Sequence, residues 1–144
     1  MAKSSSPRKH TKQDLRPQIR IMFRKAIAMG PGKADLLRAI DETGSISAAA
    51  RQMEMSYRRA WLLIDDMNQC FRHAVVSAKP GGSQGGGAVL TEFGAELVRD
   101  YRAIEMAAEV AAKKRLRGLE AALRKSRAAN SAKPKKTSIR RRKP

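Results

Sequence analysis

The sequence predicts a mainly α-helical fold with a small β wing, organised around a helix-turn-helix between Gly44 and Asn68. Three observations predict it. Apolar residues recur every three or four positions in several segments, as in helices with one buried face. Two short apolar runs border a glycine-rich stretch, which favours two strands with a long connection. A last apolar stripe, from Phe93 to Leu123, predicts a long C-terminal helix.

The chain begins as a basic arm and then becomes strand-like. Residues 1–17 are rich in Ser, Lys, Arg and Pro and cannot bury apolar surface, so we expect a flexible arm. Between Gln18 and Lys25, residues Ile19, Ile21 and Phe23 occupy every second position. That period of two predicts one half-buried strand.

A first helix is predicted from Lys33 to Thr43, after the break at Gly30-Pro31-Gly32. Leu36, Leu37 and Ile40 recur in it at helical spacing. Gly44 stands where a left-handed C-terminal cap is wanted. We therefore expect this helix to end at Gly44.

The segment GSISAAARQMEMSYRRAWLLIDDMN predicts two further helices with a tight turn between them. Ser47 is placed to cap a short helix over Ala48–Met53, and Ser56 to cap a longer one over Tyr57–Phe71. Only Glu54 and Met55 separate these helices, and the small side chains of Ala48, Ala49 and Ala50 allow a close approach. In the longer helix an apolar stripe faces the core, formed by Ala60, Ile64, Met67 and Phe71.

The wing is predicted from Ala74–Val76 and Ala88–Leu90, which flank the stretch AKPGGSQGGG. A phosphate cradle is a less favoured interpretation of these glycines, because no Lys-Ser or Lys-Thr follows them and a strand-like run does. Thr91 can then cap the long helix. Its first half is expected to pack on the core and its second half to form a dimer seam.

Charge is concentrated at the two ends of the chain. Residues 1–25 hold 8 basic and 1 acidic residue, residues 26–112 hold 9 and 11, and residues 113–144 hold 14 and 1. Basic tails indicate a polyanion partner, because phosphates neutralised by Lys or Arg release counterions. The central part is close to neutral, so specificity must come from its side chains.

These patterns predict four parts of the chain. They are a flexible basic arm (1–17), a DNA-binding domain (18–112), a helix extension (113–125) and a disordered basic tail (126–144). No membrane span or secretory signal is expected, which indicates a cytoplasmic protein. The single cysteine indicates that packing, not a disulfide, stabilises the fold.

Double-stranded DNA is the expected partner, because hydroxyl and guanidinium groups cluster where the longer helix begins. Arg58 and Arg59 are the leading base-contact candidates. The alternative is an ordinary helical hairpin with solvated arginines. The candidate DNA-contacting residues of this region are Ser45, Ser47, Arg51, Ser56, Tyr57, Arg58 and Arg59.

No catalytic residues, metal ligands or cofactor are expected. Cys70 and His73 have metal-like spacing, but a zinc site needs three or four ligands. Adjacent residues on a helix point apart, which makes the neighbouring carboxylates Asp65 and Asp66 a solvated face. Trp61 follows Tyr57 by four residues, so the rings can stack; packing on the core is favoured over facing DNA.

The pattern closely resembles ModE-type regulators and, more loosely, LysR-type regulators. The likeness rests on GPGKADLLRAIDETGSIS, SYRRAW with DDMN, and GGSQGGGAVLTEFG, in that order, within residues 18–101. It implies a winged helix-turn-helix that dimerises on a two-fold operator, with the wing residues Lys79 and Gln84 at flanking DNA backbone. ModE proteins usually carry C-terminal molybdate-binding domains. Because the sequence ends within about 40 residues of the predicted winged helix, the expectation here is a chain without those domains, for which molybdate binding is doubtful.

The expected function is thus a dimeric DNA-binding transcriptional regulator of the bacterial cytoplasm, associated with the nucleoid. The alternative is a sequence-tolerant architectural protein of the nucleoid type, whose basic tails do the binding. An enzyme is not expected, because no nucleophile with a base and no cofactor motif is present.

Overall fold

The computed structural model describes residues 15–79 and 87–124. Of the described residues, 16–113 form one compact unit and 114–124 belong to another. The predicted arm lies almost wholly outside the described residues, and the predicted tail lies wholly outside them. None of the helices described is both long and apolar enough to cross a membrane.

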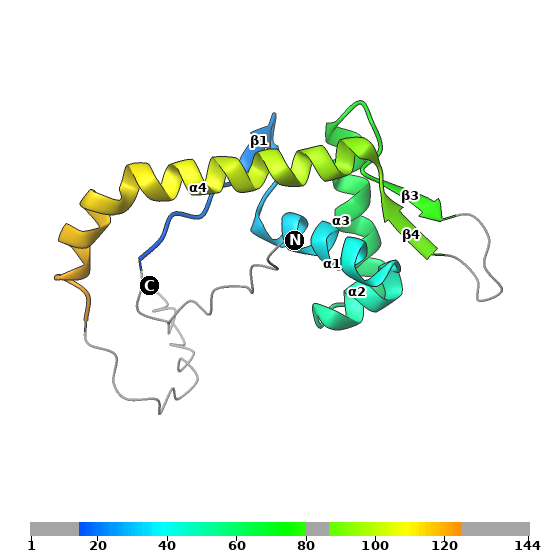
Figure 1. Cartoon of the computed structure of the whole chain (residues 1–144), viewed down its shortest axis with the longest axis horizontal. Helices are drawn as coiled ribbons and strands as arrows, with labels where there is room; N and C mark the ends of the chain where they lie inside the picture. Colours follow the sequence, from blue (N-terminus) through cyan, green and yellow to red (C-terminus); the bar gives the residue numbers. More distant parts are fainter. Residues whose placement is uncertain (1–14, 80–86, 125–144) are drawn as a thin grey trace, which may run out of the picture. The chain divides into compact units, whose positions relative to one another are not determined.

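The described residues contain four helices and two small antiparallel sheets (Figure 1). In chain order the elements are β1 (Ile21–Phe23), β2 (Ala26–Met29), α1 (Pro31–Thr43), α2 (Ile46–Gln52), α3 (Tyr57–Cys70), β3 (Val76–Lys79), β4 (Gly87–Leu90) and α4 (Glu92–Glu120).

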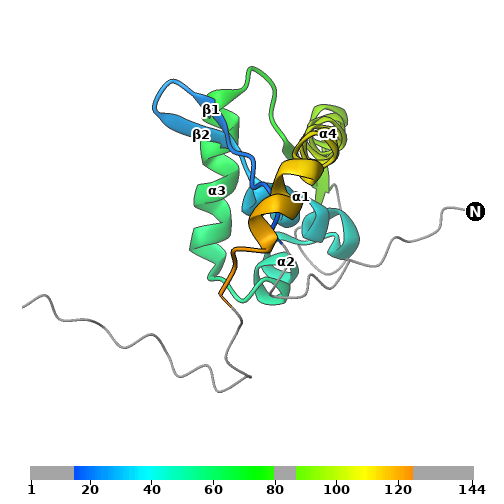
Figure 2. The ribbon, with the colours of Figure 1, turned by 90° about the vertical axis from the view of Figure 1, so that its left-hand side faces the viewer.

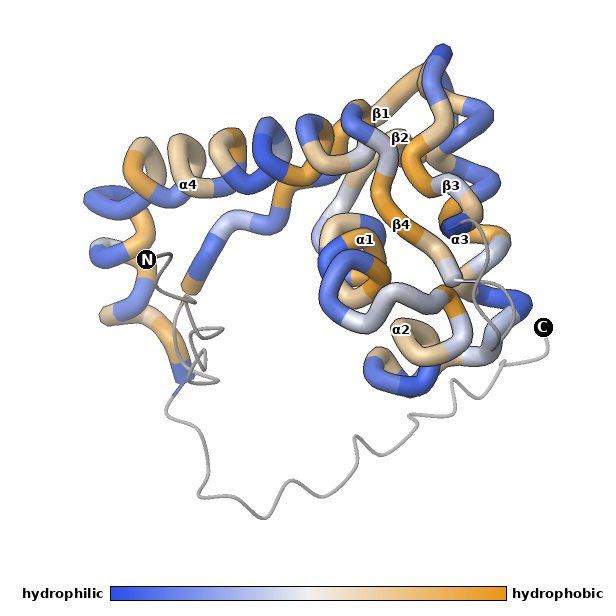
Figure 3. The backbone as a smooth tube through the Cα atoms, turned by 45° about the vertical axis from the view of Figure 1, so that its right-hand side comes forward, coloured by the Kyte–Doolittle hydropathy of each residue, from blue (hydrophilic) through white to orange (hydrophobic). Residues whose placement is uncertain are grey.

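The core of residues 16–113 lies where α1 meets α2, α3 and β4. Leu36, Leu37 and Ile40 of α1 are fully buried, as their helical spacing predicts. In Figure 3 apolar stretches of α1 and β4 lie side by side, in agreement with the packing of these two elements. The predicted stripe of α3 is confirmed, since Ala60, Ile64 and Met67 are buried and Phe71 packs against the core.

The predicted fold class, a winged helix-turn-helix with one small β wing, is wrong. The described residues hold a second sheet, because the segment expected to be one strand is a hairpin of β1 and β2. Arg24 adopts a left-handed conformation (φ 56°) that reverses the chain, and Phe23 remains 47% exposed. A period of two predicts extended backbone but not where the chain turns back. Figure 2 shows this hairpin beside α3, with which β2 packs.

The helix ends follow local capping rules. Gly44 closes α1 in the left-handed conformation (φ 69°), and its N–H donates to the Ile40 carbonyl over 2.8 Å. Ser45, not Ser47, caps α2: its Oγ accepts from the Ala48 N–H at 3.2 Å. The predicted cap at Ser47 is wrong by two residues, because the chain enters α2 immediately after Gly44 and both serines are suitable caps.

Three elements meet at the backbone of Val75, which is fully buried. Its N–H donates to Asn68 Oδ1 of α3 at 3.0 Å, and its carbonyl accepts from the Thr91 N–H at 3.1 Å. Thr91 caps α4 as predicted, since its Oγ1 accepts from the Gly94 N–H at 2.9 Å. This Val75 junction fixes the entry to β3 between the end of α3 and the start of α4.

The first half of α4 packs on the core through Leu97 and Tyr101, as predicted. The Tyr101 hydroxyl donates to the Ile19 carbonyl at 2.7 Å. Arg102 bridges Asp35 of α1 and Glu105, each at 2.6 Å. Ile104, placed in the same stripe by sequence, is 44% exposed. The stripe therefore contributes to the core only as far as Tyr101.

Replacing Gly94 with alanine is expected to destabilise the fold by about 2 kcal/mol or more, because a Cβ there would overlap the Val75 carbonyl. Gly118 of the same helix has open space around such a Cβ. Gly118→Ala should therefore leave the melting temperature unchanged or raise it, by the better helix propensity of alanine. Thermal unfolding followed by circular dichroism measures both. Equal effects of the two substitutions would contradict the packing described for Gly94.

Burial raises the pKa of Tyr101 to about 12, helped by the nearby Glu105 carboxylate and opposed by Arg102. An unfolded tyrosine titrates near pH 10. The neutral phenol thus stabilises the fold fully below about pH 10, and this contribution is lost as the pH rises towards 12. Tyr101→Phe should lower the free energy of unfolding by about 1 kcal/mol at pH 8, and less at higher pH. Urea unfolding of both proteins between pH 8 and 11 tests this; a difference that grows with pH would refute it.

Candidate nucleic-acid interface

The turn between α2 and α3 brings the two helices into close contact. Ala49, Ala50 and Ala60 are almost completely buried between them. Glu54 adopts a left-handed conformation (φ 55°) that ends α2, and the Met55 N–H donates to the Ala50 carbonyl at 2.9 Å. Small side chains allow this approach, which holds the start of α3 in a fixed direction.

The first turn of α3 presents hydroxyl, aromatic and guanidinium groups to solvent. Ser56 caps the helix, as predicted, with its Oγ accepting from the Arg59 N–H at 3.0 Å. Tyr57, Arg58 and Arg59 are all exposed. Among the described residues neither arginine forms an ion pair, so both cations are free to bind an anion.

A groove of about 250 Å³ is lined by the start of α2, by one side of α3 and by the hairpin of β3 and β4. Ser45 and Ser47 line one side, and Tyr57 and Trp61 of α3 line another. The hairpin contributes Val76, Ser77, Ala78, Gly87 and Ala88. The structure thus brings together several candidates that the sequence placed near one another.

The hairpin is attached to the helices by its own backbone. The Ala88 N–H donates to the Gly44 carbonyl at 2.9 Å, at the junction of α1 and α2. Lys79 ends β3 opposite Gly87, is exposed, and lies at the same end of the hairpin as that attachment. Gln84, the other wing candidate, lies outside the described residues.

The remaining candidate DNA-contacting residues differ in whether their side chains already form hydrogen bonds within the protein. The hydroxyls of Ser45 and Ser56 accept capping hydrogen bonds, whereas Ser47 and Arg51 are exposed on α2. Sequence reasoning missed Trp61, because the prediction that it packs on the core is wrong: the side chain is 45% exposed. A helical wheel centred on the buried Ala60, Ile64 and Met67 would have placed it at the edge of that face.

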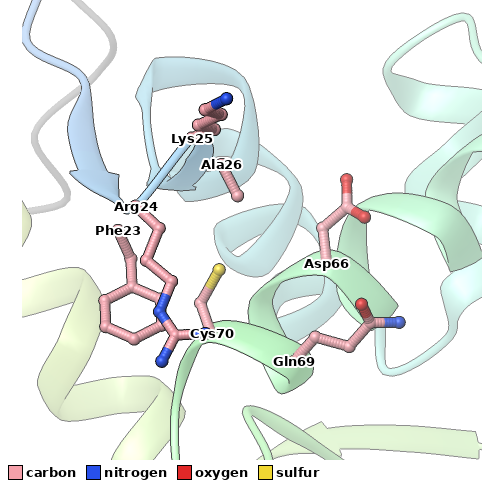
Figure 4. A pocket seen from close by; sticks show the side chains of 7 residues that line it. All are labelled: Phe23, Arg24, Lys25, Ala26, Asp66, Gln69 and Cys70. Carbon is pink, nitrogen blue, oxygen red and sulfur yellow. The ribbon is translucent and has the colours of Figure 1, made fainter.

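A second hollow, of about 400 Å³, lies between the turn joining β1 to β2 and the end of α3 (Figure 4). Figure 4 shows Arg24 beside the Phe23 ring, 5.2 Å from its centroid, with Asp66 and Gln69 on the α3 side. Cys70 also lines this hollow, whereas the His73 ring lies 5.6 Å from that of Phe93. The described residues contain no group of three His, Cys, Asp or Glu side chains able to hold a metal.

Several curated proteins are similar to part of the chain. The molybdenum-pterin-binding protein MopB of Rhodobacter capsulatus is 48% identical over 85 residues, 59% of the chain and 32% of that protein. The molybdenum transport protein ModE of Azotobacter vinelandii is 42% identical over 79 residues, 55% of the chain and 29% of that protein. The DNA-binding transcriptional dual regulator ModE of Escherichia coli K12 is 44% identical over 71 residues, 49% of the chain and 27% of that protein.

The chain therefore spans less than a third of the length of these relatives. No protein-family model matches it. The relatives' names describe transcriptional regulation, molybdenum transport and molybdenum-pterin binding, and none describes an enzyme. None mentions a winged helix-turn-helix or a LysR-type protein, so the names do not support that part of the prediction.

The expectation of a ModE-type protein without molybdate-binding domains is wrong. The relatives include proteins named for binding or transporting molybdenum. The expectation relied on the short distance from the predicted wing to the last residue, and that distance carries no information about ligand binding. The expectation that molybdate binding is doubtful therefore loses its basis as well.

Proposed function

We propose that this chain acts in a DNA-binding transcriptional regulator and that the exposed first turn of α3 enters the DNA major groove. The observation that carries the proposal is the exposed pair Arg58 and Arg59, which form no ion pair with any described residue and lie at a helix start capped by Ser56. Arginine forks match the acceptor edge of guanine and the oxygens of phosphate. The similarity to a DNA-binding transcriptional dual regulator supports the same function. The relatives' names suggest molybdenum as the signal to which the whole protein responds.

The charge along α3 limits how the helix meets DNA. Arg58 and Arg59 lie in its first turn, while Asp65 and Asp66 are exposed about two turns later. Carboxylates repel phosphates, so only the first two turns can approach the duplex closely. The helix therefore enters the groove by its N-terminal end, where unpaired backbone N–H groups also favour an anion.

The neighbouring elements provide backbone contacts in this proposal. Ser47 of α2 lines the groove, and Arg51 of α2 and Lys79 of β3 are exposed on the elements that border it, where they would contact flanking phosphates. Gln84 is placed with them by the sequence alone. The basic ends of the chain add attraction without sequence preference. The bacterial nucleoid is then the place of action.

We also propose that the regulator is a homodimer formed through α4. Met106 and Val110, four residues apart on one face of this helix, have exposed fractions of 67% and 73%. Exposed apolar side chains that gather on one helix are typical of a protein interface. A two-fold dimer would present two α3 helices to half-sites about 34 Å apart, one turn of DNA.

Arg58→Ala combined with Arg59→Ala is expected to abolish selection of a DNA motif from a random duplex pool at about 150 mM salt. Binding to a duplex enriched by the unchanged protein should fall at least about tenfold, since each specific base contact contributes roughly 1–3 kcal/mol. Arg72→Ala combined with Arg99→Ala removes the same charge from exposed positions away from the first turn of α3. That control should keep the motif. Enrichment retained by the first variant would refute this role for α3.

The alternative function is that of an architectural protein that binds DNA through its basic ends. Deleting residues 126–144, which hold eight basic and no acidic residues, distinguishes it from a sequence-specific regulator. A regulator should lose affinity and salt dependence but keep its preferred motif. An architectural protein should lose nearly all binding and show no motif before or after the deletion. Fluorescence anisotropy with the enriched and a scrambled duplex distinguishes these results.

Val110→Glu is expected to shift the protein from dimer to monomer, of 15.9 kDa, because the dimer interface would bury an unpaired carboxylate. Sedimentation velocity measures the shift. Glu109→Gln, at the adjacent exposed position, should leave the dimer intact. A Val110→Glu protein that remains dimeric would place the interface elsewhere.

A further inference from the structure

Two aromatic side chains lie exposed beside the arginines of α3. Tyr57 and Trp61 are 52% and 45% exposed, and their rings meet edge to face with centroids 6.3 Å apart. We name them the Tyr57–Trp61 pair. Both line the 250 Å³ groove next to the β3–β4 hairpin. A pair of large rings at the surface costs hydrophobic free energy unless a partner covers it.

The position of the Tyr57–Trp61 pair restricts the chemical properties of a partner that could bind there. The rings occupy the first two turns of α3, the part of the helix that lies before Asp65 and Asp66. On the helix, Arg58 directly follows Tyr57, so a cation and a ring project from adjacent positions of the same turn. Ser45, Ser47 and Ser77 also line the groove. The partner must therefore be anionic and also present small apolar groups.

A DNA major groove containing thymine combines these two properties. The C5-methyl group of thymine is the apolar feature of the major-groove edge, and apolar side chains read it by contact. The edge-to-face geometry fixes each ring against the other, so the pair loses little conformational entropy when it covers a methyl group.

We propose that the Tyr57–Trp61 pair reads thymine methyl groups next to the bases contacted by Arg58 and Arg59, which gives the site a preference for thymine at defined positions. This inference rests on the proposed function, because it requires α3 to enter the major groove. It adds a specificity determinant that the arginines alone do not supply.

The test replaces thymine with uracil, one position at a time, in the duplex that the unchanged protein enriches. Uracil keeps every hydrogen-bonding group and lacks only the methyl group. Affinity should fall roughly fourfold at one or two positions in each half-site, the effect of uncovering one methyl group. Trp61→Ala and Tyr57→Ala should bring the thymine-to-uracil affinity ratio at those positions close to one. Trp61→Phe, which keeps a ring, should retain part of it.

Phe23→Ala is the matched control, because Phe23 is an aromatic residue with a similar exposed fraction, 47%, on β1. It should leave the affinity ratio unchanged. Trp61 is the only tryptophan, so its fluorescence reports the same contact. The thymine duplex should protect it from acrylamide quenching more than the duplex with uracil at the sensitive positions.

The two proposals fail in different ways. Selection that enriches no motif would overturn the proposed function and this inference with it. A motif that depends on Arg58 and Arg59 but tolerates uracil everywhere, or whose uracil sensitivity survives Trp61→Ala, would overturn only the inference.

Discussion

The arrangement of the candidate interface depends on the backbone of Val75. Its N–H and carbonyl are bound by Asn68 of α3 and by the start of α4, and Gly94 packs directly on it. A buried backbone group without a partner costs more than an ordinary hydrogen bond contributes, so this junction tolerates little displacement. The hairpin consequently leaves the core at a fixed point beside α3, and the groove between them is a built feature of the fold.

The distribution of charge assigns different tasks to different parts of the chain. The basic ends carry most of the positive charge, while residues 26–112 hold 9 basic and 11 acidic residues. In this nearly neutral segment, the positions of the charged side chains matter more than their number. Within the part of the chain that the structure describes, Arg58 and Arg59 at one end of α3 form no ion pair, whereas Arg102 is held by two carboxylates and Lys33 lies 3.9 Å from Asp66. The surface proposed to meet DNA therefore contains two exposed arginines that no described carboxylate engages.

Local signals in the sequence predicted much of the fold. Gly44, Ser56 and Thr91 act as expected, because a cap depends on a few neighbouring residues. The winged helix-turn-helix assignment failed at the first strand, where alternation predicts extended backbone but not the reversal at Arg24. Ser45 displaced Ser47 as a cap because two suitable serines lie two positions apart.

The candidate site was predicted less completely than the helices. Spacing brought Ser47, Tyr57 and the two arginines near one another, and the structure places Ser47 and Tyr57 on one groove. The exposure of Trp61 was not predicted. A ring at the edge of an apolar stripe is buried or exposed depending on which element packs opposite it. That neighbour is the hairpin, which is distant in sequence. The length of chain after the wing was also a poor guide to molybdate, since the chain spans under a third of its relatives.

The most direct measurement of the central claim is a titration of the ¹⁵N-labelled chain with an enriched duplex, followed by amide chemical shifts. If the first turn of α3 enters the major groove, the amide signals of Tyr57–Leu62 and of Val76–Lys79 should shift together and saturate at one duplex per dimer. Shifts confined to residues 1–15 and 114–144, with α3 unaffected, would contradict it.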